Sequence, residues 1–219
     1  MTNGRVIAID GAAGSGKSTL ARNLARTLDL PYVNTGLMYR ALTASAIRNR
    51  VSEDDVEALI DLTRGLRFTL GRSDPRELKV EGFDDRALTT PDVERSVSRV
   101  ARHPRVRAWM HEMQRTLGAN GAVVEGRDIG SVVFPDAVVK LYLEASRGAR
   151  IERRVRERPR AGSDEIAAVL EARDELDART NPPVPPPGAT VIDTRVLDAD
   201  ATLRTAIALI REQAPELVR

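Results

Sequence analysis

The sequence of 219 residues contains no cysteine and few aromatic residues. The lack of cysteine excludes disulfide bonds, thiolate metal sites and cysteine nucleophiles. Aromatic residues make up 3% of the chain, against 42% for all hydrophobic residues, so we expect a core built mainly from Leu, Val, Ile and Ala. So few aromatic side chains also disfavour a protein that stacks nucleic-acid bases.

Long apolar runs are absent as well. No run approaches the roughly 18 residues that a membrane-spanning helix needs, and no charged and then apolar leader opens the chain. The formal net charge is +2, from 34 basic and 32 acidic residues, and this near balance does not indicate nucleic-acid binding. We therefore expect a soluble cytoplasmic protein that binds neither membrane nor nucleic acid, and a monomer.

Lysine is scarce, because only Lys17, Lys79 and Lys140 occur among the 34 basic residues. Lys17 lies in the segment RVIAIDGAAGSGKSTLARNLARTL. This segment predicts a buried strand over residues 6–9, a glycine-rich turn, and a helix with leucines at every fourth position. The turn completes the pattern G-x-x-x-x-G-K-[ST], which is typical of the P-loop that cradles nucleotide phosphates.

The P-loop pattern has a physical basis. Glycines let the backbone wrap around an anion in conformations that other residues rarely adopt, and the amide groups and dipole of a helix N-terminus attract negative charge. Lys17 can reach the outer phosphates, and the Ser18 hydroxyl can bind Mg²⁺. An ordinary glycine-rich turn is the alternative. We predict a site for ATP and Mg²⁺ formed by Gly11, Ala12, Ala13, Gly14, Ser15, Gly16, Lys17, Ser18 and Thr19, with Ser18 as the metal ligand.

Predicted strands and helices alternate along the chain, which favours an α/β fold with a parallel sheet covered on both faces. Helix caps are expected at Ser52, which forms a capping box with Asp55, at Thr90 before Pro91, and at Ser163. The predicted strands are residues 6–9, 30–33, 122–125, 138–143 and 190–193, with two short antiparallel strands within 66–82. The main predicted helices are residues 37–48, 53–63, 105–117, 163–180 and 199–213.

Arginine is concentrated beyond the predicted strand ends. Residues 147–160 contain seven arginines, and Arg40, Arg107 and Arg127 come from separate elements. Each of them alone is compatible with a surface ion pair. Together they suit a second phosphorylated substrate, or charge that develops on a transferred phosphoryl group. No residue pattern indicates a catalytic base, which agrees with an acceptor that is already anionic.

The segments IAIDGAAGSGKSTLA, NTGLMYRA, HPRVR, EGRDIGSVVFPDA and RDELD resemble, in order and separation, those of the bacterial cytidylate kinases, of the nucleoside monophosphate kinase family. The resemblance covers nearly the whole chain. It implies one P-loop kinase domain with a five-stranded parallel sheet and helices on both faces. Within it, residues 1–63 and 103–219 would be the core, residues 64–102 a monophosphate-binding insert, and residues 155–163, approximately, a lid.

The resemblance also implies an activity: transfer of the γ-phosphoryl group of ATP to CMP or dCMP, with Mg²⁺. By this resemblance Arg40 and Arg127 would hold the CMP phosphate, and the Asp128 carboxylate would accept a hydrogen bond from the cytosine amino group. The implied CMP site consists of Thr35, Arg40, Ser98, Arg107, Arg127, Asp128, Arg173 and Asp177. The implied catalytic residues are Lys17, Arg127, Arg150 and Arg154, of which Arg150 and Arg154 would lie on the lid near ATP.

Several positions depart from the family pattern. Thr35 stands where the family often has serine, and Thr180 stands where it usually has arginine. Either the neighbouring Arg179 takes over that contact, or the contact is lost. The segment PPVPPP, residues 182–187, favours a stiff polyproline connector over a partner-binding motif. Two other functions stay open: a P-loop kinase for another nucleotide or an acid metabolite, and a non-catalytic ATP-binding module.

Overall fold

The computed structural model describes residues 5–157, 162–181 and 183–218. The strands are β1 Val6–Gly11, β2 Tyr32–Asn34, β3 Phe68–Leu70, β4 Leu78–Val80, β5 Ala122–Glu125, β6 Val139–Glu144 and β7 Thr190–Asp193. The α-helices are α1 Lys17–Thr27, α2 Thr35–Arg48, α3 Val56–Thr63, α4 Pro91–Ala101, α5 Pro104–Gly118, α6 Arg147–Glu157, α7 Ser163–Thr180 and α8 Ala199–Gln213. Short helical turns are η1 Ala87–Thr89, η2 Ile129–Val133 and η3 Pro215–Leu217.

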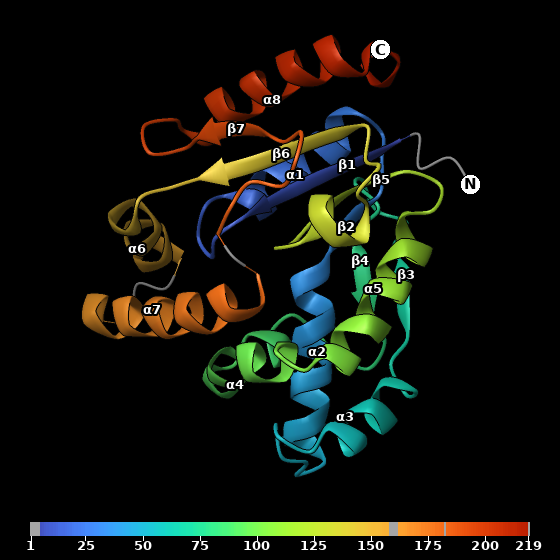
Figure 1. Ribbon diagram of the computed structural model, residues 1–219, viewed down its shortest axis with the longest axis vertical. Coiled ribbons are helices and arrows are strands. Elements are labelled where there is room, and N and C mark those ends of the chain that lie inside the picture. Colours follow the sequence, from blue (N-terminus) through green and yellow to red (C-terminus); the bar gives the residue numbers. More distant parts are fainter. Residues whose placement is uncertain (1–4, 158–161, 182, 219) are drawn as a thin grey trace.

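The central feature is a parallel five-stranded sheet in the order β2-β5-β1-β6-β7, which confirms the predicted fold class (Figure 1). In β1, Ile9 pairs with Glu125 of β5, and Gly11 pairs with Leu143 of β6. This register aligns the carboxyl ends of the three central strands at one edge of the sheet. In parallel α/β sheets, ligands bind beyond that edge.

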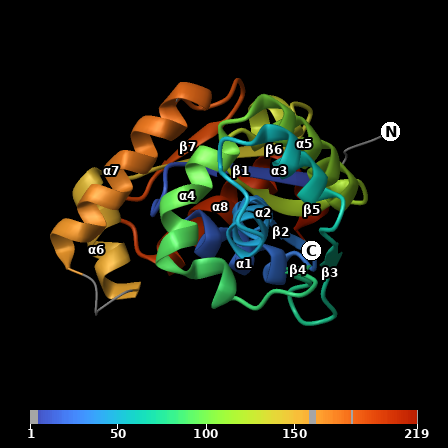
Figure 2. The same cartoon turned by 90° about the horizontal axis from the view of Figure 1, so that it is seen from below.

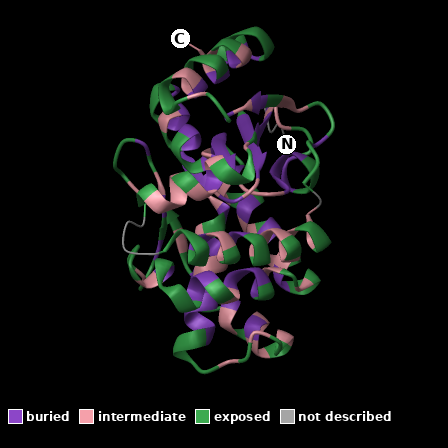
Figure 3. Cartoon of the chain, turned by 90° about the vertical axis from the view of Figure 1, so that its left-hand side faces the viewer, coloured by how far each residue is buried: buried purple, intermediate pink, exposed green. Residues whose placement is uncertain are grey.

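Alternate residues of β1 face opposite layers of the core. Val6 and Ala8 contact the cluster formed with α2, α3, α4, α5 and η2, whereas Ile7 and Ile9 contact the cluster formed with α1 and α8. Both faces are therefore covered, and β1 is buried along its whole length. Figure 3 shows the buried residues gathered in the strands and on the inward faces of the helices.

A second group of elements extends from the sheet on the α2 side. Seen from below, α4 lies between α7 and α2 (Figure 2). The antiparallel β3–β4 hairpin is tied to the core through its connecting loop, because Tyr32 N–H donates to Arg76 O at 3.0 Å and Arg22 pairs with Glu77 at 2.7 Å. None of the described helices combines the length and the apolar composition that spanning a membrane requires.

The helix caps differ from the predictions at two of the three positions. Thr90 caps α4 as predicted, accepting the Val93 N–H at 3.4 Å. The helix predicted from residue 53 begins later, because the Asp55 carboxylate accepts the Ala58 N–H at 3.1 Å, while the Ser52 hydroxyl is bound by the Asp54 N–H. Ser163 is the first residue of α7 and not its cap, since it already has helical geometry and follows Gly162.

Gly118, at the end of α5, packs against the buried ring of Phe134, which follows η2. A Cβ atom at this position would lie 2.6 Å from Phe134 Cζ. Gly118→Ala should therefore lower the free energy of unfolding by about 1–3 kcal/mol through overpacking, although alanine is the better helix former. Urea denaturation measures this, with Gly148→Ala in α6 as control, because a Cβ atom at that position would enter open space. Equal stability of the two variants would contradict the packing described.

Candidate active site

A cleft of about 820 Å³ opens at the carboxyl edge of the sheet. The P-loop turn, α1 and the ends of β5 and β7 form its floor, and α2, α4, α6 and α7 contribute to its walls. The residues predicted for the two substrates line this one cleft, with three exceptions, Gly11, Ala12 and Arg150. The strand order and its crossover connections thus bring together side chains that lie far apart in the sequence, such as Lys17 and Asp177.

The P-loop has the backbone that its glycines permit. Gly11 and Gly16 have φ angles of 144° and 97°, and a Cβ atom on Gly11 would lie 2.5 Å from Leu143 O. Lys17 is buried, and its Nζ donates to Ala12 O at 2.7 Å. Burial, together with the positive charge of Arg127, holds the pKa of Lys17 well below its usual range. An anion at the P-loop would favour the charged form of this lysine.

A buried carboxylate, missed by the sequence analysis, stands beside Ser18. The Ser18 hydroxyl donates to Glu125 Oε2 at 3.0 Å, and the Tyr32 hydroxyl donates to Glu125 Oε1. Glu125 ends β5, next to the P-loop strand. A hydroxyl and a carboxylate are the hard oxygen ligands that Mg²⁺ prefers. The signal in the sequence was an acidic residue closing an apolar run.

Asp10 anchors the turn that follows β5. Its buried carboxylate accepts the N–H groups of Ile129 and Gly130, both at 2.8 Å. Burial raises the pKa of Asp10, although the two backbone hydrogen bonds oppose this. The turn holds Arg127 and Asp128, and Arg127 Nη1 in addition donates to Gly11 O at 2.7 Å. The last residues of β1 therefore position both side chains.

Asp128 lies in a polar pocket with Arg107 and His111, both from α5. Arg107 forms an ion pair with Asp128 and also donates to Asn181 Oδ1 at 2.7 Å, and His111 Nε2 lies 2.9 Å from the Asp128 carboxylate. Burial alone would raise the pKa of Asp128, but hydrogen bonding with His111 and the charge of Arg107 hold it below its usual range. Asp128 is therefore an ionised acceptor. Neither His111 nor Asn181 was singled out in the sequence.

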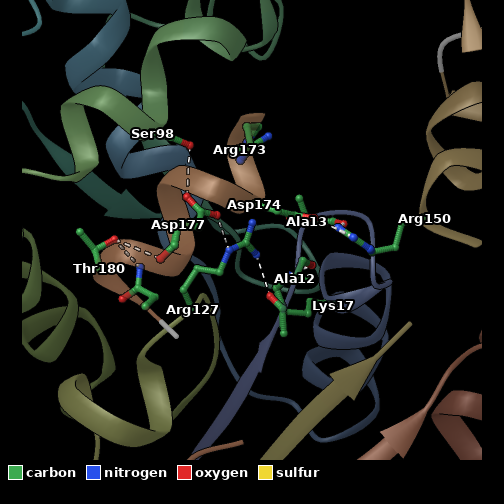
Figure 4. A network of polar contacts seen from close by, with 12 residues as sticks. Ala12, Ala13, Lys17, Ser98, Arg127, Arg150, Arg173, Asp174, Asp177 and Thr180 are labelled. Atoms are coloured by element: carbon green, nitrogen blue, oxygen red, sulfur yellow. Dashed lines mark hydrogen bonds and ion pairs between the residues drawn. The ribbon is translucent and has the colours of Figure 1, made fainter. Parts of the chain in front are cut away.

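Two carboxylates hold the arginines opposite the P-loop. Glu94 of α4 pairs with Arg40 at 2.5 Å and with Arg173 at 3.3 Å. Asp177 pairs with Arg127 at 2.9 Å and accepts the Ser98 hydroxyl at 3.2 Å (Figure 4). Burial and the charges of Arg127 and Arg40 lower the pKa of Arg173 to about 10. Nothing in the sequence distinguished Glu94 from the solvent-facing acids of α4.

The arginines of α6 divide into different environments. Arg150 is buried behind the P-loop, where it donates to Ala13 O at 3.2 Å and to both Asp174 oxygens, at 3.1 and 2.7 Å (Figure 4). Arg154 lines the cleft, as does Arg153, which donates to Ser15 O at 3.0 Å. The expected position of Arg150 beside the ATP phosphates stays a prediction. Arg150 and Arg153 are three positions apart, so they reach the P-loop from successive turns of α6.

The end of α7, after Asp177, contains Thr180 in place of the arginine that is usual in the family, and Arg179 beside it. The Thr180 hydroxyl donates to Asp177 O at 3.3 Å, Arg179 is exposed and outside the cleft lining, and Asn181 lines the cleft. The Arg179 side chain therefore lies outside the cleft in this arrangement, and its role stays a prediction. Part of the expected lid, residues 158–161, and Pro182 of the proline-rich segment lie outside the described residues.

The sheet order, the P-loop and the facing arginines define a P-loop kinase. The fold is similar to a gluconokinase from Sinorhizobium meliloti, with a TM-score of 0.50 and 16% identity over 99% of this chain and 97% of that one. It is also similar to an uncharacterized protein from Eubacterium ventriosum, with a TM-score of 0.51 and 15% identity over 94% of this chain and 98% of that one. At such identities these likenesses show the fold alone.

Sequence comparison is more specific. A family model described as cytidylate kinase matches residues 7–212. A cytidylate kinase from Desulfitobacterium hafniense is 38% identical over 94% of this chain and 93% of its own length. One from Thermus thermophilus is 40% identical over 94% and 98%, and one from Acidiphilium cryptum is 41% identical over 97% and 98%. The chain belongs to the cytidylate kinase family, as the resemblance in its motifs indicated.

The ion pair of Asp177 should make stability depend on pH. The charge of Arg127 and nearby groups hold the pKa of Asp177 below its usual range even though burial opposes this. The unfolded chain then binds this proton first as the pH falls, so the stabilisation is present above about pH 4 and is lost below it. Asp177→Asn should therefore lower the free energy of unfolding by about 1–3 kcal/mol at pH 7. The gap in free energy of unfolding between the variant and the parent protein should narrow below about pH 4. Denaturant unfolding across pH 3–7 measures the gap; a gap independent of pH would refute the ionic pairing.

Arg150 and Arg154 should respond differently to truncation. Arg150→Ala leaves Asp174 and the Ala13 carbonyl without their guanidinium partner, so the free energy of unfolding should fall by about 3 kcal/mol. Arg154→Ala removes a half-exposed pair with Glu157, so stability should change by less than about 1 kcal/mol, while the rate of phosphoryl transfer should fall at least about tenfold. Thermal unfolding and a coupled ADP assay on both variants test this difference between the two arginines. A larger loss of stability in Arg154→Ala than in Arg150→Ala would contradict it.

Proposed function

We propose that this chain transfers the γ-phosphoryl group of ATP to CMP or dCMP, giving ADP and CDP or dCDP. Its membership in the cytidylate kinase family supports this activity. The observation that carries it in the structure is one cleft with a P-loop on one side and paired arginines beside a buried, ionised Asp128 on the other. The two halves suit two anionic substrates that meet at their phosphates.

The donor side would be the P-loop. Its backbone amides and Lys17 would bind the ATP phosphates, and Ser18 and Glu125 would hold Mg²⁺ directly or through water. The ion would supply positive charge to the phosphate oxygens during transfer. Two protein oxygens suffice, because Mg²⁺ usually keeps several waters and binds substrate phosphates as well. Arg154, on the wall of the cleft, would add charge where the transferred group passes.

The acceptor side would place the CMP phosphate at Arg40 and Arg127, with Arg173 and Asp177 beside the sugar and the phosphate. The base would lie in the pocket of Thr35, Ser98, Arg107 and Asp128. An ionised Asp128 can accept a hydrogen bond from the cytosine amino group. Uracil has a carbonyl at that position, and two facing acceptors would cost about 1–3 kcal/mol for each unpaired group.

The expected division of the chain is part of this proposal. Residues 64–102 would act as the monophosphate-binding insert, since α4 brings Ser98 to the acceptor side. Residues 155–163 would be the lid that excludes water from the reaction. The cytoplasmic location and the monomeric state stay predictions.

A nucleotide panel tests the proposal. The purified protein with ATP and Mg²⁺ should give the highest kcat/KM with CMP or dCMP, against UMP, AMP and shikimate. Asp128→Ala should lose most of the activity and the preference for CMP over UMP, because the amino group loses its acceptor. Asp136→Ala is the control, since Asp136 is an exposed acid that follows the same turn. Higher kcat/KM with AMP, UMP or shikimate than with CMP would overturn the proposal.

A further inference from the structure

Glu94 occupies an unusual position for a carboxylate in a site that binds anions. It lies on α4, its side chain is 6% exposed, and it bridges Arg40 of α2 and Arg173 of α7. Figure 2 shows these three helices side by side. The bridge therefore joins three walls of the cleft through a single acidic group.

The Glu94 carboxylate occupies N–H donors of Arg40 and Arg173 that an acceptor phosphate would also bind. Arg40 Nη1 donates to Leu88 O at 3.1 Å and faces Glu94 Oε1 at 2.5 Å, and Arg173 Nη1 donates to Glu94 Oε2. Arg173 Nε is buried and has no hydrogen-bond partner among the described residues. A phosphate and a carboxylate both bind the guanidinium fork through parallel N–H···O bonds. The two anions therefore compete for the same groups.

We propose that the Glu94 carboxylate competes with anions for Arg40 and Arg173 and so weakens the binding of phosphate groups at the acceptor side of the cleft. This inference rests on the proposed function only in assigning these arginines to the acceptor phosphate. An acceptor has to displace the Glu94 carboxylate from the two arginines. Simple inorganic anions make no other contacts, so they bind weakly to this site. A nucleotide also binds through its base and sugar, and those contacts offset the competition.

Removing the charge of Glu94 has two opposite consequences. The buried guanidinium groups lose compensation, so the protein without a bound anion becomes less stable. An anion that restores the compensation then binds more tightly and stabilises the variant more than the parent protein. A role confined to holding the helices together predicts only the first effect, with weaker anion binding.

The experiment uses Glu94→Gln in the full chain, with a non-hydrolysable ATP analogue and Mg²⁺ at saturation so that the P-loop is filled. Thermal unfolding is followed while inorganic phosphate is added. The melting temperature without phosphate should fall, and the apparent Kd for phosphate should become about tenfold tighter than in the parent protein. Asp92→Asn is the matched control, because Asp92 lies on the same helix and forms an exposed pair with Arg95.

Unchanged or weaker phosphate binding in Glu94→Gln, or equal tightening in Asp92→Asn, would overturn the proposal. If Glu94→Gln does not fold, Glu94→Asp takes its place: the shorter side chain keeps the charge but withdraws it from the arginines, so phosphate should still bind more tightly than in the parent. Phosphate binding does not depend on which acceptor is phosphorylated. A failure here is therefore distinguishable from a failure of the nucleotide panel.

Discussion

Buried guanidinium groups need a counter-charge, and this constraint shapes the whole cleft. The four arginines assigned to the acceptor side each pair with a carboxylate: Arg40 and Arg173 with Glu94, Arg127 with Asp177, and Arg107 with Asp128. Their partners come from helices and turns far apart in the sequence. The ion pairs consequently fix the geometry of the helices around the cleft, and they set how strongly a further anion can be bound.

The sheet supplies the fixed frame for these pairs. The register of the sheet aligns the carboxyl ends of its three central strands, so that Gly11, Glu125 and Leu143 lie at the same edge. Asp10 then uses two backbone hydrogen bonds to hold the turn that carries Arg127 and Asp128. One rigid element therefore presents both Asp128, the acid proposed to contact the base, and Arg127, proposed to bind the phosphate, which is how a site gains precision from a scaffold.

Much of this arrangement could be predicted from local patterns. The alternation of apolar strands and helices gave the parallel sheet, and the spacing around Lys17 gave the P-loop. The caps of α3 and α7 were misplaced, because several residues near each helix start can cap it and only the backbone decides among them. Glu94, His111 and Glu125 were missed for another reason: a single acid or histidine has no local signature, and its burial depends on contacts across the fold.

The central claim is that the carboxylate-held arginines and Asp128 together bind a cytidine monophosphate opposite the P-loop. A crystal structure with CMP, Mg²⁺ and a non-hydrolysable ATP analogue tests it most directly. We expect the CMP phosphate within hydrogen-bond distance of Arg40 and Arg127, and the cytosine amino group against the Asp128 carboxylate. A base bound away from Asp128, or a phosphate that contacts neither arginine, would contradict it.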